Sequence, residues 1–175
     1  VGGQGRIILA SNLTTVDANW NVSGPVTLQL GGASVATPSA LGAASSTVTL
    51  GAGSVLASGA IATTYGNALT SNGGTLTGST GGAVVATYSA GSTLSLGGGA
   101  ETGLLLADIT NSATARSLNV QGKITGAGGL VVTGLTATTP GTAGVIGSVD
   151  SDFTGNVTVT QGTLSFGLNA AGQSS

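Results

Sequence analysis

Short runs in which apolar and polar residues alternate recur along the whole chain. The clearest of these runs are residues 26–30, 48–50, 94–96, 118–120, 130–132, 157–159 and 164–166. Glycine or another turn-forming residue stands close to each run, a pattern that predicts short β-strands. Several neighbouring runs lie roughly 20 to 25 residues apart, the spacing at which one unit completes a turn of a solenoid. The pattern therefore predicts an all-β chain that coils as a parallel β-solenoid with glycine-rich turns.

A β-sandwich is the main alternative to the solenoid. From Leu118 onward the apolar runs lie closer together, and strands spaced by roughly 8 to 12 residues are typical of sandwiches. Helix has little support, because glycine interrupts most windows. Residues 104–121 contain neither glycine nor proline, but their Thr, Asn and Ser content favours strand and loop there too.

The composition predicts a folded chain with a thin core. Of the 175 residues 33 are glycine, 40% are apolar and only 5% are charged. Disordered chains combine low hydrophobicity with high charge, which is the opposite balance. Aromatic residues make up 3% of the chain, so the core has to be built from Val, Leu, Ile and Ala. Each turn of a coiled β architecture contributes only a few such side chains.

Missing residue types exclude several kinds of site. The chain has no cysteine and no histidine, which removes disulfides, thiolate zinc sites and thiol nucleophiles. Its three basic residues, Arg6, Arg116 and Lys123, are too few to neutralise a run of phosphates, so we expect no nucleic-acid binding. No run of 18 apolar residues is present that could span a bilayer.

The first residues and the absence of methionine suggest how the chain is produced. It begins Val1-Gly2-Gly3 and contains no methionine. We therefore expect residues 1–175 to be a single solenoid segment that is processed or excised from a larger protein.

A second level of pattern lies in residues 37–59 and 122–167, the most repeat-like parts of the chain. Residues 126–130 form a Gly-Ala-Gly-Gly-Leu turn and strand, residues 153–155 an aromatic-Thr-Gly turn, and residues 162–164 a Gly-Thr-Leu step after a valine-rich strand. In these features the chain resembles the passenger-associated repeats of bacterial autotransporters and related giant surface proteins. The resemblance implies a right-handed parallel β-helix, export to the cell surface and a place in a long stalk or fibre.

The two halves of this repeat are separated by residues 135–152, which we expect to loop out. The open ends of a strand ladder will pair with another copy unless they are capped. We therefore expect a structural subunit of an extracellular fibre or of a bacterial cell-surface stalk or adhesin. Its expected partner is a second copy of itself, stacked end to end, and a host or matrix surface is a further possible partner.

Acidic residues offer little chemistry. Asp17, Glu101, Asp108, Asp150 and Asp152 are the only acids. Asp150 and Asp152 flank Ser151 and can point the same way on an extended segment, which makes them a weak candidate for holding Ca²⁺ with backbone carbonyls. They could also be a glycosidase acid pair or simply two solvated loop acids. We expect no catalytic residue, no cofactor and no enzymatic activity.

Threonine steps suggest an alternative function, a surface-binding module at an adhesin tip or on glycan or ice. Thr-x-Thr steps occur at residues 47–49, 75–77 and 158–160, although threonine is also simply a residue that strands prefer. Trp20, Tyr65 and Tyr88 could form an exposed surface on which sugars stack, or they could fill the interior or cap an end.

Overall fold

The computed structural model describes residues 5–31, 40–58, 63–78, 85–88, 93–106, 117–120, 122–134, 142–145 and 151–166. Within these ranges the chain forms β-strands joined by turns, and no helix. Neighbouring strands within each sheet are parallel throughout the described part. The fold is therefore all-β with parallel sheets, and the antiparallel strand pairs of a β-sandwich are not found among the described strands.

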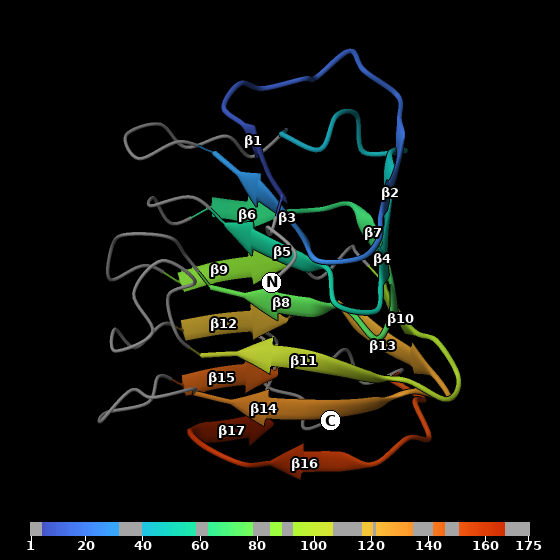
Figure 1. Cartoon of the computed structure of the whole chain (residues 1–175), viewed down its shortest axis with the longest axis vertical. Helices are drawn as coiled ribbons and strands as arrows, with labels where there is room; N and C mark the ends of the chain where they lie inside the picture. The colour runs from blue at the N-terminus through green and yellow to red at the C-terminus, as the bar shows by residue number, and fades with distance from the viewer. Residues whose placement is uncertain are drawn as a thin grey trace.

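The strands form three sheets that we call A, B and C. Sheet A contains β1 (Gly5–Leu9), β3 (Val26–Leu30), β5 (Val55–Ser58), β8 (Thr75–Thr77), β11 (Glu101–Leu105), β14 (Gly129–Thr133) and β16 (Val157–Val159), in that spatial order. Sheet B contains β2 (Asn19–Val22), β4 (Thr47–Gly51), β7 (Ala68–Asn72), β10 (Thr93–Leu96) and β13 (Lys123–Gly126). Sheet C contains β6 (Thr63–Tyr65), β9 (Val85–Tyr88), β12 (Ser117–Val120), β15 (Thr142–Val145) and β17 (Thr163–Phe166). The strands are stacked from β1 at one end to β16 at the other (Figure 1).

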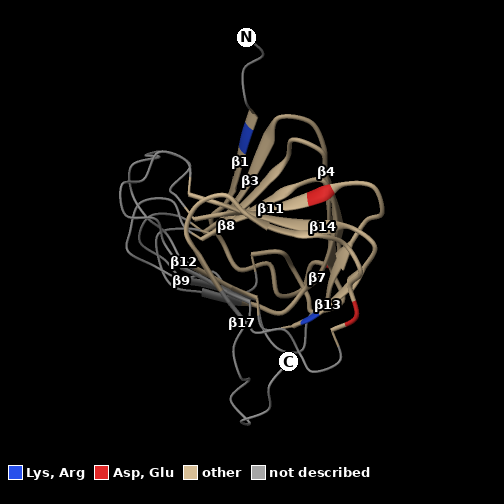
Figure 2. Cartoon of the chain, turned by 90° about the horizontal axis from the view of Figure 1, so that it is seen from below, with Lys and Arg blue, Asp and Glu red and all other residues tan. Residues whose placement is uncertain are grey.

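The chain visits the three sheets in a repeating order. From β5 to β14 it passes from sheet A to sheet C, then to sheet B and back to sheet A, one strand at a time. Seen along the stack, the sheets lie on three sides of a common interior (Figure 2). In place of a further strand in sheet B, residues 151–155 run beside β13, where the Asp152 and Thr154 amides donate to the carbonyls of Ile124 and Gly126, both at 2.9 Å.

Equivalent residues of successive strands in sheet A stand in register. One inward-facing set, which we call the aliphatic column, consists of Ile7, Leu28, Leu56, Leu76, Leu104, Val132 and Val159. Its members from Leu28 to Val132 are no more than 1% exposed. Burial of such side chains provides about 1.5–3 kcal/mol each, which compensates for the small number of inward positions on each strand.

The core continues along the other two sheets. In sheet B, Val48, Leu69, Leu94 and Ile124 stand in register and are at most 2% exposed. In sheet C, Tyr65 is fully buried at the N-terminal end and Leu118 is 1% exposed further along. The core is thus a thin stack of aliphatic side chains, as the composition predicts.

All seven apolar runs identified in the sequence are confirmed as parts of strands, and β3 and β16 have the predicted bounds. The separation along the chain between paired strands varies more than predicted. Val55 pairs with Thr75, 20 positions later in the sequence, and with Thr27, 28 positions earlier. The difference lies in the connections, because the register within the sheet is kept. Of residues 104–121, the structure describes the end of β11 and all of β12 as strand, whereas residues 107–116 and 121 lie outside the described residues.

The expectation that residues 135–152 loop out is wrong in part. Residues 142–145 form β15, which pairs with β12 on one side and β17 on the other. Its sequence, Thr-Ala-Gly-Val, has little strand propensity of its own. Two flanking strands supply hydrogen-bond partners on both edges, and this tertiary context outweighs the weak local preference.

Gly126 shows why the turns need glycine. Its φ of 105° is in the region that residues with a side chain avoid. A Cβ atom at this position would also overlap the backbone carbonyl oxygen of Leu96 on the strand above. The close stacking of neighbouring turns therefore depends on the missing side chain.

Candidate functional site

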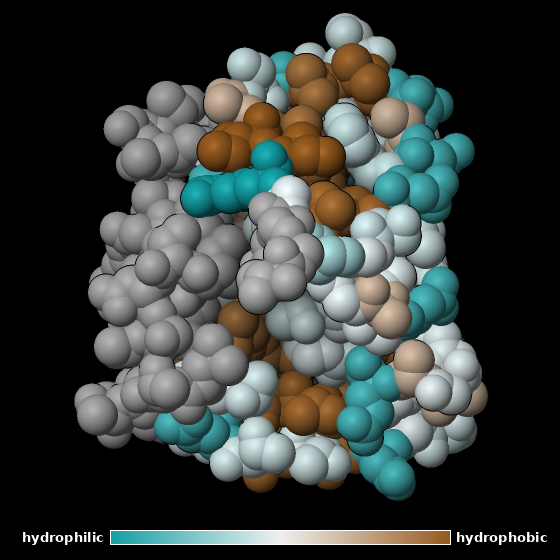
Figure 3. All heavy atoms as spheres, in the orientation of Figure 1, coloured by the Kyte–Doolittle hydropathy of each residue, from teal (hydrophilic) through white to brown (hydrophobic). Residues whose placement is uncertain are grey.

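Large apolar side chains that reach solvent are gathered at the ends of the stack. Among the described residues they are Ile7 and Ile8 on β1, Val16 in the segment after β1, and Val157 and Val159 on β16. Apolar surface is visible at the level of β1 and again near the lower end, close to β14 and β16 (Figure 3). The middle of the stack carries no comparable exposed residue within the described ranges.

The exposed residues at the ends belong to the same column as the buried residues between them. Ile7 is 51% exposed and Val159 is 47% exposed, whereas Leu104 between them is fully buried. All three occupy inward positions of sheet A, so the exposure of Ile7 and Val159 arises because no further strand lies beyond β1 or β16 among the described residues. The chain thus presents an unfinished core at each end.

Sheet A also ends in unpaired backbone. Its outermost strands are β1 and β16, and neither has a neighbour on its outer side among the described residues. An edge strand presents free N–H and C=O groups that can pair with another strand. In sheet B, by contrast, residues 151–155 already bond the outer edge of β13.

A second candidate surface is the outward side of sheet B, which we call the polar face. It consists of two columns in register along β2, β4, β7, β10 and β13: Asn19, Thr47, Ala68, Thr93 and Lys123 in one, and Asn21, Thr49, Thr70, Ser95 and Thr125 in the other. These residues are half-buried or exposed and alternate along their strands with the inward-facing residues, so this side of sheet B faces away from the core. The Thr47 hydroxyl donates to the Asn19 Oδ1 atom at 2.7 Å, which links two successive strands.

The Thr-x-Thr steps do not form one surface. Residues 47–49 lie on β4 of sheet B, whereas residues 75–77 lie on β8 and residues 158–160 on and just after β16, both in sheet A. The polar face could not be recognised from these steps, because its two columns mix Asn, Ser and Thr with other residues. In Asn19-Trp20-Asn21 and in Thr93-Leu94-Ser95 an apolar residue stands between two polar ones, and this alternation is the signal that could have revealed the polar face.

The aromatic residues that can be placed face the interior. Tyr65 is fully buried and its hydroxyl donates to the Leu30 carbonyl at 3.2 Å. Trp20 packs against the core at the first position of the inward column in sheet B, and its indole N–H donates to the Leu41 carbonyl at 2.8 Å. The interpretation of these two residues as interior or end-capping side chains is confirmed, while the side chain of Tyr88 lies outside the described residues.

Of the weak calcium candidates, Asp150 lies outside the described residues and Asp152 already has partners. Asp152 Oδ2 lies 3.0 Å from Lys123 Nζ. A hydrogen bond from Thr125, together with the Lys123 ammonium, lowers the pKa of Asp152 below its ordinary value. Ser151 accepts a hydrogen bond from the Ile124 amide at 3.1 Å, which fixes this segment beside β13.

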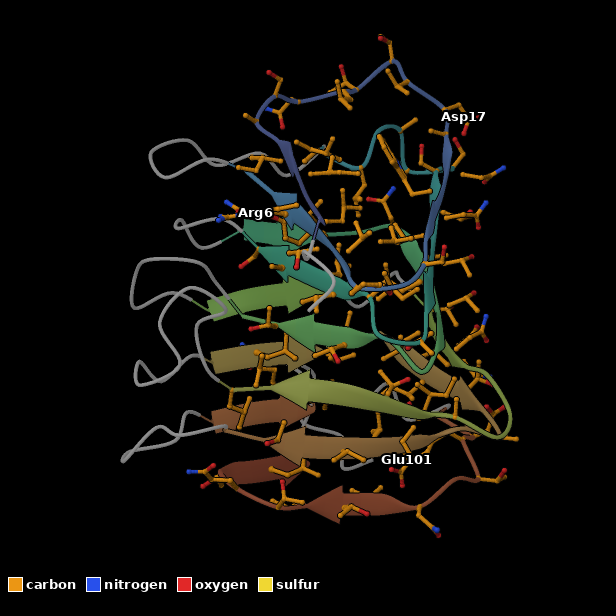
Figure 4. The ribbon with its side chains drawn as sticks, in the orientation of Figure 1. Arg6, Asp17 and Glu101 are labelled. Carbon is orange, nitrogen blue, oxygen red and sulfur yellow. The ribbon has the colours of Figure 1, made fainter. Side chains whose placement is uncertain are left out.

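The remaining charges are scattered. Arg6 lies at the β1 end, Asp17 beside sheet B and Glu101 near the lower end (Figure 4). Arg6 donates to the Gln29 side-chain oxygen on the next strand. Glu101 borders a shallow hollow of about 290 Å³ that is otherwise lined by small or polar residues of three successive turns. Among the described residues, no three acids stand close enough together to hold a metal ion.

Comparison with known proteins identifies no relative: no family model matches the chain, and neither does any curated protein or solved structure. The described residues include no helix long and apolar enough to cross a membrane.

Proposed function

We propose that the chain is a right-handed parallel β-helix that serves as a structural subunit of an extracellular fibre or bacterial cell-surface stalk and assembles end to end. The repeated passage through three parallel sheets supports a β-helix. Crossover connections between parallel strands are right-handed in almost all proteins, which supports the hand. The resemblance of residues 126–130 and 153–164 to autotransporter passenger repeats supports a cell-surface location, and we assign no catalytic role.

The observation that carries the proposal is the placement of exposed apolar residues. Exposed apolar residues that gather in a patch mark interaction sites, and unpaired hydrophobic edge strands are places where chains associate. Here both outermost strands of one sheet are of this kind. Because the two ends differ, a contact between them joins copies head to tail and does not close into a dimer.

In such a fibre the stacked strands would act as a rod. Each added copy would continue the backbone hydrogen bonds and bury the exposed ends of the aliphatic column. The low charge of the chain, 5% of residues, leaves little electrostatic repulsion between copies. The rod would present the polar face of sheet B to its surroundings, including a host or matrix surface.

Electron microscopy of the purified chain, combined with light scattering over a range of concentrations, tests the proposal. We expect filaments of uniform width, and a mass that rises with concentration. The variant Ile7→Lys places a charge in the exposed end of the aliphatic column and should prevent assembly. Thr70→Lys adds the same charge on the polar face and serves as the matched control. A wild-type chain that stays monomeric at every concentration would contradict the proposal.

The polar face supports a second candidate function, binding to an extended hydrated surface such as ice. Strands of a sheet repeat about every 4.8 Å, so its two columns place hydroxyl and amide groups at a regular spacing, except at Ala68 and Lys123. The one charged residue of this array, Lys123, is paired with Asp152. Because Trp20 faces inward, the described part of this face offers no aromatic ring for sugar stacking, which favours ordered water over glycan as the ligand.

Inhibition of ice recrystallisation tests this second function. Replacing Thr49 and Thr70 at the centre of the polar face with lysine should abolish the inhibition. Replacing Thr75 with lysine, on the outward side of sheet A and away from both ends of the stack, should leave it unchanged. Equal activity in all three proteins, or none in the wild type, would reject ice binding.

A further inference from the structure

We infer that copies of this chain join through sheet A, with β16 of one copy pairing in parallel with β1 of the next so that Val159 lies opposite Ile7. This inference rests on the proposed end-to-end assembly and specifies its interface. It places Val157 opposite Gly5 and Thr158 opposite Arg6 across the junction. The partner is thus a second copy of the same chain, in a defined register.

The choice of sheet A follows from its edges. Both of its outermost strands carry large exposed apolar residues, Ile7 and Ile8 at one end and Val157 and Val159 at the other. The last strand of sheet B is not free in this way, because Asp152 and Thr154 bond to its backbone. Sheet A is therefore the place where a new strand gains both backbone hydrogen bonds and apolar contact.

The direction follows from the parallel pairing. β1 pairs in parallel with β3, and β16 pairs in parallel with β14. If a second copy is shifted along the stack and not turned over, its β1 runs parallel to β16 of the first copy. A head-to-head contact would instead pair β1 with β1 in the antiparallel sense, and no two of the described strands pair in that way.

The register follows from the aliphatic column. Each neighbouring pair of strands in sheet A keeps this column aligned, from Ile7 opposite Leu28 to Val132 opposite Val159. A slip by one residue would set Val159 against Arg6 or Ile8, on the opposite face of the sheet. A slip by two residues would move the next copy by about 6.6 Å along the strand direction, so that sheets B and C of the two copies would no longer be aligned.

The chemistry across the aligned junction is compatible. Val159 and Ile7 would bury the surface that each now exposes. Arg6 would face the uncharged Thr158 and could keep its hydrogen bond to Gln29. No like charges meet across these three residue pairs.

Disulfide trapping tests the inference directly, because the chain has no cysteine of its own. Neighbouring parallel strands are about 4.8 Å apart, which lies within the Cα separation of roughly 4.4–6.8 Å that a disulfide needs. Positions 7 and 159 stand on the two outermost strands of a seven-stranded sheet. A disulfide between them in the double variant Ile7→Cys/Val159→Cys therefore has to join two copies.

We expect mild oxidation of this double variant to give a ladder of covalent multimers, with peptide mapping that links position 7 to position 159. The variant Ile8→Cys/Val159→Cys is the matched control, since its thiols would lie on opposite faces of the sheet and should not react. Disulfides in Ile7→Cys/Val157→Cys would reveal a two-residue slip, and dimers of the single variant Ile7→Cys would reveal a head-to-head contact. Either result would overturn the inference.

Light scattering of the reduced proteins separates this inference from the proposed function. Assembly without a link between positions 7 and 159 would reject the register and leave end-to-end assembly standing. A wild-type protein that remains monomeric in light scattering, together with a double variant that gives no multimers on oxidation, would reject both, and would assign the exposed edges to a different partner.

Discussion

Leu76 and Leu104 lie directly opposite each other on neighbouring parallel strands, and neither side chain is exposed to solvent. Each leucine thus packs against equivalent residues above and below, so that the aliphatic column is continuous through sheet A. At its two ends the same column reaches Ile7 and Val159, which are about half exposed. One column therefore serves two purposes: its middle stabilises the single chain, and its ends are the proposed contact between chains.

This division predicts opposite effects for two truncations in the aliphatic column. Leu104→Ala leaves a cavity in the fully buried middle and should lower the free energy of unfolding by about 2–5 kcal/mol. Val159→Ala removes a side chain that is 47% exposed and should cost the monomer less than about 1 kcal/mol. Urea unfolding followed by the fluorescence of Trp20 measures both values.

Assembly provides the second reading for the same pair of variants. Val159→Ala should weaken end-to-end association in light scattering, because it removes apolar surface from the proposed junction. If Val159→Ala instead unfolds as readily as Leu104→Ala, the end of the column is part of the monomer core, and the division is wrong.

Close stacking of the turns predicts a strong effect of a methyl group at Gly155. A Cβ atom there would overlap the Gly128 carbonyl group and lie 2.5 Å from the Gly129 nitrogen. Backbone atoms cannot move aside as a flexible side chain can, so Gly155→Ala should destabilise the chain by about 1–3 kcal/mol.

Gly98 supplies the control for Gly155. A Cβ atom at Gly98 would lie 3.7 Å from the Ala127 Cβ atom, an ordinary contact, and Gly98 has no positive φ. Gly98→Ala should therefore change stability by no more than about 0.5–1 kcal/mol. Thermal unfolding of the two variants side by side compares them, and equal losses would show that backbone overlap is not the cause.

The sequence predicted those strands whose side chains alternate strongly. β3 and β16 were found with their bounds because Val, Leu and Thr alternate there between turn residues. β15 was missed because Thr-Ala-Gly-Val shows no such alternation, and it is a strand because its neighbours pair with it on both sides. β1 was missed because Ile7 and Ile8 are both apolar, as suits a strand at the end of the stack.

The candidate surfaces could not be predicted from the sequence because they depend on register. Asn21, Thr49, Thr70, Ser95 and Thr125 form one column of the polar face. Their separations along the chain are unequal, since connections of different length lie between them. Composition could predict a polar surface and a thin aliphatic core, but only the pairing of strands brings these five residues into line.

The ion pair of Lys123 and Asp152 predicts a small dependence of stability on acid. Hydrogen bonding by Thr125, then Lys123, lowers the pKa of Asp152 in the folded chain, whereas an unfolded chain has an Asp pKa of about 3.9. A lowered folded pKa means that the contribution is present above about pH 3.9 and is lost as the pH falls through the folded value. Asp152→Asn should remove this component, seen as a shallower fall of the melting temperature in acid.

Between about pH 5 and pH 8 we expect a nearly constant melting temperature, because the chain has neither histidine nor cysteine to titrate there. Thr125→Val serves as a partial control for Asp152→Asn, since it removes the main hydrogen bond but keeps Lys123. A wild-type melting temperature that changes strongly around neutral pH would contradict this account.

The hydroxyl of Thr102 predicts a substitution that stabilises the chain. Thr102 is fully buried on an inward position of sheet A, and its Oγ1 atom has no hydrogen-bond partner within the described part of the chain. An unsatisfied buried hydroxyl costs about 1–3 kcal/mol, so Thr102→Val, which keeps the shape, should raise the free energy of unfolding by about 1 kcal/mol or more. Ser46 is equally buried, but its hydroxyl accepts from the Ala18 amide at 3.0 Å and donates to the Val16 carbonyl at 3.2 Å. Ser46→Ala should therefore destabilise the chain in the same urea experiment, and a loss of stability in both variants would mean that the Thr102 hydroxyl has a partner, such as a buried water molecule.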